Sequence, residues 1–204
     1  VNPIQLHVTL AGVAPTQAEL LGFPFRAVDG TPMVEAIAGN ETPPRLIVTM
    51  IWDAGGRNVL GRWKDDWPYL ESLIPQGAWY EHATVGTSPT STAQTHATIG
   101  TGAFPDAHGI VAHRLRIGDE LTTPWAKGPA YLVEPTLADL YDRAMGNEPV
   151  VGEIGTVSIH LGMLGHGSMW GGGLSPPSTT PRRRGWRISP VCGWISARTS
   201  VSAP

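Results

Sequence analysis

The spacing of hydrophobic positions changes several times along the chain, and these changes predict both strands and helices. Residues 45–52 form an almost continuous apolar run, which is typical of a strand buried on both faces of a sheet. Residues 5–10 alternate between polar and apolar side chains and predict an edge strand or hairpin; we expect the rest of residues 1–44 to be irregular. Residues 77–80 lead into a further short strand.

Helical spacing appears between and after these strands. Residues 65–75 and 136–145 each place apolar side chains on one face, and residues 150–159 return to a strand pattern. In the second of these helices Asp139 and Asp142 fall on the polar face, so we expect both to be solvated. Strands that alternate with helices predict an α/β fold, a mostly parallel sheet flanked by helices.

A third helix is predicted to begin inside a cluster of hydroxyl side chains. Ser91 followed three places later by Gln94 is a capping-box pattern, which puts Thr92 in the first turn. The free N–H groups of that turn favour a bound anion, and a hydroxyl there is well placed to meet a phosphate. A capped helix without chemistry is the more common meaning of such a pattern. Small residues along the helix allow close packing and a glycine can end it: Ala93, Ala97, Gly100 and Gly102.

Asp53 is the second candidate site residue. It directly follows the strand predicted at residues 45–52 and is followed by Ala54-Gly55-Gly56. A carboxylate at the carboxyl end of a central strand lies where α/β folds bind ligands. An ordinary Asp-containing turn explains the same residues equally well.

The string from Pro89 to Val111 resembles the nucleophile segment of the type I phosphodiesterase/nucleotide pyrophosphatase family, within the alkaline phosphatase superfamily. The residues that carry the resemblance are Pro89-Thr90-Ser91-Thr92, His96, Thr101-Gly102, Phe104-Pro105 and His108-Gly109-Ile110. It covers residues 45–173 and implies an incomplete alkaline-phosphatase-like fold. It also implies that Thr92 is the nucleophile and a metal ligand, with Asp53 as the first metal-binding carboxylate.

The chain departs from the family pattern just after the nucleophile. The family has Phe-Pro-Asn where this chain has Ala93-Gln94-Thr95. Thr95 stands at the place of the Asn that helps to hold the phosphoryl group, so Thr92 and Thr95 are the expected phosphate ligands. His108 is expected to make a structural hydrogen bond.

Composition and charge limit the possible partners. The single cysteine, Cys192, excludes an internal disulfide and a Cys-based metal cluster. A net charge of −3 points to no nucleic-acid partner, and no apolar run reaches the roughly 18 residues of a membrane span. The expected partner is a small phosphate ester, and the resemblance favours a secreted or periplasmic protein.

The pattern breaks after Gly173. Residues 1–173 hold nine basic and all 17 acidic side chains, whereas residues 174–204 hold five arginines and no acid. We interpret the chain as an N-terminal arm (residues 1–44), a partial alkaline-phosphatase-like domain (45–173) and an irregular, poorly packed basic tail (174–204). The tail is best explained by truncation of the domain and a shift of reading frame; the alternative is an arm that binds nucleic acid or a membrane.

The change in composition after Gly173 affects the expected metal site, because further ligands are expected beyond that point. The resemblance implies two divalent ions, zinc in the family, whose further ligands lie in Asp-x-x-x-His and Asp-His-Gly motifs, and neither motif occurs in this chain. His113 lies near Asp119 and Glu120 with a spacing that fits no ligand motif, and His160 and His166 are interpreted as loop residues. The expected function is a metal-dependent phosphate-ester hydrolase with impaired activity. The alternative is a non-catalytic remnant that binds anions or metal weakly.

Overall fold

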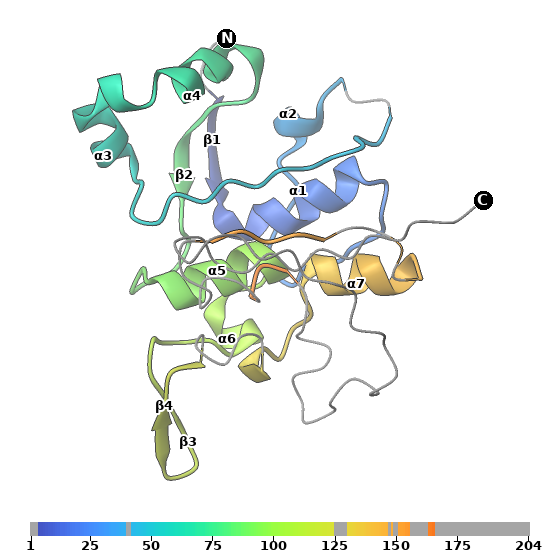
Figure 1. Cartoon of the computed structure of the whole chain (residues 1–204), viewed down its shortest axis with the longest axis vertical. Helices are drawn as coiled ribbons and strands as arrows, with labels where there is room; N and C mark the ends of the chain where they lie inside the picture. Colours follow the sequence, from blue (N-terminus) through green and yellow to red (C-terminus); the bar gives the residue numbers. More distant parts are fainter. Residues whose placement is uncertain are drawn as a thin grey trace, which may run out of the picture.

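The structure is a computed structural model that describes residues 4–39, 42–124, 130–146, 148, 151–155 and 163–165. Within these ranges the protein is a mixed α/β chain in which helices pack together beside two small sheets (Figure 1). The predicted fold class is therefore confirmed in its coarse form, and the parallel pairing is present in a sheet of two strands. The tail at residues 174–204 lies outside the described residues, as do His160 and His166.

The parallel sheet joins the start of the chain to the segment before the candidate site. Strand β1 (Ile4–Thr9) pairs with strand β2 (Tyr80–Thr84), with Val8 opposite Ala83. Strand β1 lies close to the alternating pattern of residues 5–10, and β2 begins at the end of residues 77–80, where a short strand was expected. Since β2 ends a few residues before Ser91, the sheet positions the chain that leads into the next helix.

Three helices that contact one another form the packed part of the molecule. They are α1 (Val13–Leu20), α5 (Thr92–Thr101) and α7 (Leu137–Ala144). Ala93 and Ala97 of α5 are fully buried with Ile110, Leu132 and Met163. A methyl group added at Gly100 would come within 2.2 Å of the Met163 carbonyl oxygen. The small residues of α5 thus pack closely, as the sequence predicts.

Helix α1 lies where the sequence pattern predicts irregular chain. Ala14 and Ala18 of α1 are buried against Leu137 of α7, and Phe23 and Phe25 cover this second core cluster. Small side chains and a proline in the first turn give α1 no strong helical spacing, so tertiary packing decides its structure. The 3-10 helix η1 (Leu10–Gly12) joins β1 to α1, and the short helix α2 (Val34–Ile37) follows.

A projecting arm separates residues 45–52 from β2 (Figure 1). The arm contains, in order, α3 (Arg57–Arg62), η2 (Lys64–Asp66), α4 (Pro68–Leu73) and η3 (Ile74–Gln76). The helix predicted at residues 65–75 is present as three short consecutive helices. Beyond α5 come α6 (Pro105–His108) and a hairpin of β3 (Leu115–Ile117) and β4 (Glu120–Thr122), which the sequence pattern did not indicate.

The prediction of a buried strand at residues 45–52 is wrong for the described structure. This segment is extended, but residues 42–51 form no backbone hydrogen bond with another described residue. Leu46, Val48 and Met50 are 76%, 72% and 72% exposed. A strand needs neighbours to pair with, and no described strand lies alongside this segment. Residues 151–155, part of another predicted strand, are likewise extended without strand pairing.

The two carboxylates of α7 also differ from expectation. Asp139 and Asp142 are each only 5% exposed, so the prediction that they are solvated is wrong. Helix α7 contacts both α1 and α5, so it packs among other helices instead of standing alone on the surface. Thr136 caps α7 as predicted, because its hydroxyl accepts the Asp139 N–H at 3.1 Å.

Candidate active site

Thr92 is the first residue of α5. Ser91 is the N-cap, with extended dihedral angles of φ −135° and ψ 156°, and Gly102 ends the helix in the left-handed conformation. Both ends are as the sequence predicts, but the reciprocal capping box does not form. The Ser91 hydroxyl donates to the Gln94 side chain, whose amide nitrogen donates to the Val111 carbonyl at 2.9 Å. The first-turn N–H groups of α5 therefore receive no side-chain cap.

Asp53 lies at a tight turn that directs it towards Thr92. The Gly55 N–H donates to the Trp52 carbonyl at 2.9 Å, and Ala54 between them has φ +59°. A left-handed conformation is uncommon for a residue with a side chain and carries strain. The Thr92 hydroxyl donates to Asp53 Oδ2 at 3.0 Å and lies 3.3 Å from Oδ1. The fold thus brings together two residues that are far apart in the sequence and that the resemblance gives as metal ligands.

Thr95 and His96 lie one helical turn beyond Thr92. Positions three and four residues apart share a helix face, so both belong to the Thr92 side of α5. Thr95 is half-buried, whereas His96 is buried. In the sequence, His96 is one of the residues that carry the family resemblance, with no site role predicted for it. Its spacing of four residues from Thr92 is the feature of the sequence that predicts its place on the same face of the helix.

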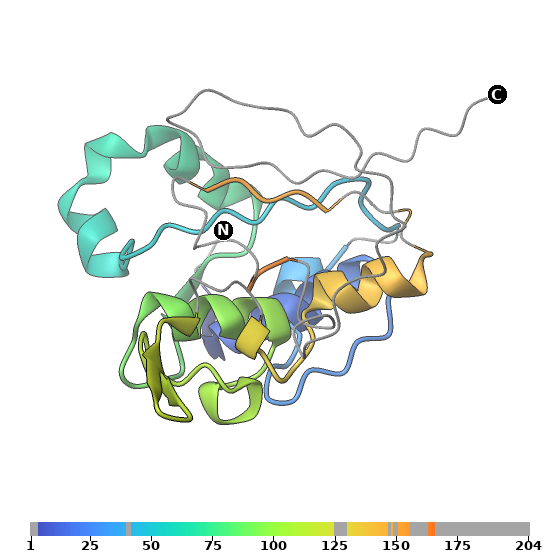
Figure 2. The ribbon, with the colours of Figure 1, turned by 60° about the horizontal axis from the view of Figure 1, so that its bottom comes forward.

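A large cavity adjoins the Asp53–Thr92 pair. Its volume is about 1340 Å³, and it lies between two extended segments on one side and helices α1, α5 and α7 on the other. Figure 2 shows these segments, residues 45–52 and 151–155, above the helices. Asp53 and His96 supply polar groups to the wall, and Ile47, Ile51 and Ile99 supply apolar surface. A ligand in this cavity would contact both the Asp53 carboxylate and the apolar surface of the isoleucines.

His108 supports the site without lining it. The Ile110 N–H donates to His108 Nδ1 at 3.1 Å, so the ring proton is on Nε2, which donates to the Thr98 hydroxyl at 3.1 Å. Burial of the imidazole lowers its pKa to about 4, well below the usual 6.5. The expected structural hydrogen bond is confirmed, and it ties the segment after α5 back onto the helix.

The donors in the described part of the chain do not make a complete metal site. No group of three or more His, Cys, Asp or Glu side chains converges there, and His113, Asp119 and Glu120 do not form one. Asp53 and Thr92 offer neighbouring oxygen atoms, whereas zinc sites in proteins typically use three or four protein ligands. The described residues alone therefore do not fit the expected pair of divalent ions.

A hydroxyl at the start of a helix, bonded to a carboxylate on a neighbouring turn, is compatible with the class of hydrolases that use a hydroxyl nucleophile. Comparison with protein families agrees with this class. A model of the type I phosphodiesterase / nucleotide pyrophosphatase family matches residues 47–190, and the chain belongs to that family. The match continues beyond Gly173, where we placed the end of the resemblance. No curated protein and no solved structure matches the chain.

Family membership indicates a phosphodiesterase or pyrophosphatase type of hydrolase, in a family known to use metal ions. Of the helices in the described part of the chain, none has both the length and the apolar character to cross a membrane.

Proposed function

We propose that this protein hydrolyses phosphate esters, phosphodiesters in particular, with Thr92 as the nucleophile. The observation that carries the proposal is the hydrogen bond from the Thr92 hydroxyl to Asp53 Oδ2, at 3.0 Å. It fixes the direction of the hydroxyl at the N-terminus of α5, where N–H groups without a side-chain cap favour an anion. The family supplies the reaction type, and this bond supports the choice of Thr92 and Asp53.

The proposed reaction has two steps. Thr92 Oγ attacks phosphorus, the bond to the leaving alcohol breaks, and the hydroxyl proton passes to solvent or to Asp53. Water then attacks the phosphoryl-Thr92 intermediate and regenerates the hydroxyl. The first-turn N–H groups of α5 and the Thr95 hydroxyl would hold the phosphoryl oxygens.

Metal ions in this family activate the hydroxyl and stabilise charge that develops on the phosphoryl group. Two zinc ions are what the resemblance implies, and Asp53 and Thr92 would hold such an ion only together with ligands from outside the described residues. A threonine hydroxyl is a poor nucleophile without a metal or a strong base beside it. An exposed carboxylate such as Asp53 orients the hydroxyl more than it activates it. We therefore propose weak turnover.

A second candidate function is binding without catalysis. The small number of donors around Thr92 in the described part of the chain favours it. In this case the N-terminus of α5 would bind a phosphate weakly, and no phosphoryl-Thr92 intermediate would form. The division into an arm, a partial domain and a basic tail remains a proposal, as does a secreted or periplasmic location.

The test compares hydrolysis of bis(p-nitrophenyl) phosphate, with added Zn²⁺ or Mn²⁺, between the unchanged protein and Thr92→Ala. We expect weak release of nitrophenolate, at least about tenfold faster than in the variant, because removing the nucleophile removes the covalent route. Thr90→Ala is the matched control, since it removes an exposed hydroxyl two residues away. Equal rates for the protein and Thr92→Ala would contradict the assignment. Phosphate binding without turnover would favour the second candidate.

A further inference from the structure

The extended segment of residues 45–52 leaves its backbone unpaired and exposes one of its two rows of side chains. As far as Ile51, its backbone forms no hydrogen bond with another described residue. Ile47, Thr49 and Ile51 line the large cavity. The Thr49 hydroxyl accepts a hydrogen bond from the Gln17 side chain, so this row faces helix α1. The alternate residues form the opposite row and are exposed to solvent: Leu46, Val48, Met50 and Trp52.

An uncovered strand edge with an apolar face is a template for a further strand. Its N–H and C=O groups are open to a neighbouring chain, and natural proteins usually protect such edges with charged side chains, proline or a covering element. Residues 46–52 contain neither a charge nor a proline. Within the described ranges no strand pairs with them. The segment therefore has the properties of a surface that pairs with another strand.

The sequence of this segment is complementary to itself, which indicates the partner. In an antiparallel pair centred on Thr49, each residue would lie opposite the residue at the same distance on the other side of the centre in a second copy. Val48 would then lie opposite Met50 of the second copy. Leu46 would lie opposite Trp52. Directly opposed side chains are about 4.5–5.5 Å apart at Cβ, so the exposed apolar rows of the two copies would cover each other.

The ends of the segment carry opposite charges. Arg45 lies four residues before Thr49, and Asp53 lies four residues after it. Antiparallel pairing would place the Arg45 guanidinium of each copy opposite the Asp53 carboxylate of the other, and a two-fold axis makes this contact twice. Parallel pairing in the same register would place like charges opposite each other, which is destabilising. Within the described ranges neither residue forms an ion pair, so both charges are available to a second copy.

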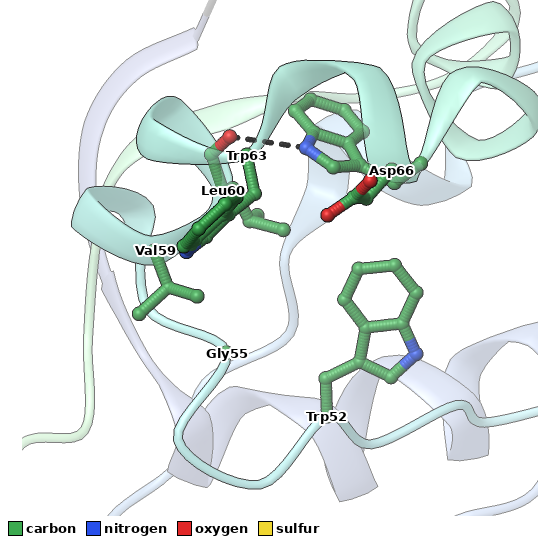
Figure 3. A pocket seen from close by; sticks show the side chains of 7 residues that line it. Trp52, Gly55, Val59, Leu60, Trp63 and Asp66 are labelled. Atoms are coloured by element: carbon green, nitrogen blue, oxygen red, sulfur yellow. Dashed lines mark hydrogen bonds between the residues drawn. The ribbon is translucent and has the colours of Figure 1, made fainter.

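The exposed row continues at one end onto the projecting arm. Trp52, which is 45% exposed, lies at a pocket of about 440 Å³ that Trp63 and Trp67 also line (Figure 3). The Trp67 indole N–H donates to the Leu60 carbonyl at 3.0 Å and holds α3 against the start of α4. Since Leu46 of the second copy would lie opposite Trp52, it would also contact this apolar surface. The pairing would thus bury more than the segment itself.

We propose that residues 45–53 pair antiparallel with the same residues of a second copy, about a two-fold axis at Thr49, and so form a homodimer. A two-fold contact uses the same surface of both copies and closes on itself, so two copies complete it. The interface is small, and we expect a dissociation constant in the micromolar range. The proposal rests on the exposed segment and does not depend on the proposed catalytic function.

The first test is the association state of the full chain, measured by sedimentation equilibrium over a wide range of micromolar concentrations. We expect a reversible equilibrium between monomer and dimer. Arg45→Glu should weaken the dimer about fivefold or more, because it replaces two attractive charge pairs by two repulsive ones. Arg26→Glu is the matched control, since Arg26 is an exposed arginine outside the segment. A protein that stays monomeric, larger species without a dimer, or equal effects of the two variants would overturn the proposal.

Cysteine variants then test the register, in a protein that also carries Cys192→Ser. Thr49→Cys places a thiol on the two-fold axis, opposite its own counterpart, and should form an intermolecular disulfide on mild oxidation. Leu46→Cys is the matched control: its two thiols would lie six residues apart along the paired strands, roughly 20 Å, whereas a disulfide needs Cα atoms within about 7 Å. Linkage of Leu46→Cys as readily as Thr49→Cys, or a dimer in which Thr49→Cys does not link, would refute the antiparallel pairing.

Discussion

The buried imidazole of His108 makes a quantitative prediction about stability and pH. Its pKa is lowered to about 4 in the folded protein by burial, whereas 6.5 is the ordinary value. The unfolded chain therefore binds a proton more readily between these values, and the free energy of unfolding falls as the pH is lowered through this window. The contribution of His108 is complete above pH 6.5 and is lost progressively towards pH 4.

The magnitude follows from the two pKa values. Lowering the pH from about 7.5 to about 5 should reduce the free energy of unfolding by about 2 kcal/mol through His108, rising to about 3 kcal/mol below both values. The assay is urea unfolding followed by tryptophan fluorescence at a series of pH values. Other carboxylates titrate at the acid end, so the quantity to compare is the difference between the protein and His108→Asn.

His108→Asn replaces the ring by an amide that does not titrate, and its oxygen can still accept the Ile110 N–H. We expect this variant to be less stable at neutral pH but to have a flatter pH profile. Thr98→Val is the control, because it removes the partner of His108 Nε2 and keeps the imidazole. It should lower stability while the acid-side loss remains. An unchanged pH profile in His108→Asn would refute the reasoning.

Three further predictions concern a helix cap, a closely packed glycine and an exposed apolar segment. Thr136→Ala should lower the free energy of unfolding by about 1–2 kcal/mol, because it removes the α7 cap, while Thr136→Ser should retain most of it; urea unfolding measures both. Gly100→Ala should cost about 1–3 kcal/mol because its methyl group meets the Met163 carbonyl, whereas Gly61→Ala, in open space, should be neutral or stabilising; thermal unfolding separates them. Val48→Lys should reduce aggregation in light scattering and change stability by less than about 0.5 kcal/mol, because this side chain lies exposed in a stretch, residues 46–52, that carries no charge.

The local features of the site could be predicted from the sequence. Ser91 and Gly102 set the ends of α5, and Thr136 caps α7, because these signals act within one helical turn. The meeting of Asp53 and Thr92 is a contact between distant residues. It agrees with the metal site that the resemblance implies, although the strand expected before Asp53 does not form in the described structure.

Features that depend on distant partners could not be predicted. An apolar run becomes a strand only when a neighbour pairs with it, and residues 45–52 have no such neighbour in the described structure. The helix of residues 13–20 depends on packing against α5 and α7, and the burial of Asp139 does not follow from the spacing of its own helix. The pocket lined by Trp52, Trp63 and Trp67 likewise forms only because the chain after Asp53 folds back on itself. The spacing of these tryptophans in the sequence does not predict it.

The most direct test of the central claim is to trap the intermediate on Thr92. The protein is mixed with bis(p-nitrophenyl) phosphate and metal, quenched in acid, digested and examined by mass spectrometry. Attack by Thr92 Oγ releases one nitrophenolate and leaves a nitrophenyl phosphoryl group on that oxygen, so the account predicts this added mass on the Thr92 peptide and none in Thr92→Ala. The same mass on another residue, or turnover that persists in Thr92→Ala, would contradict it.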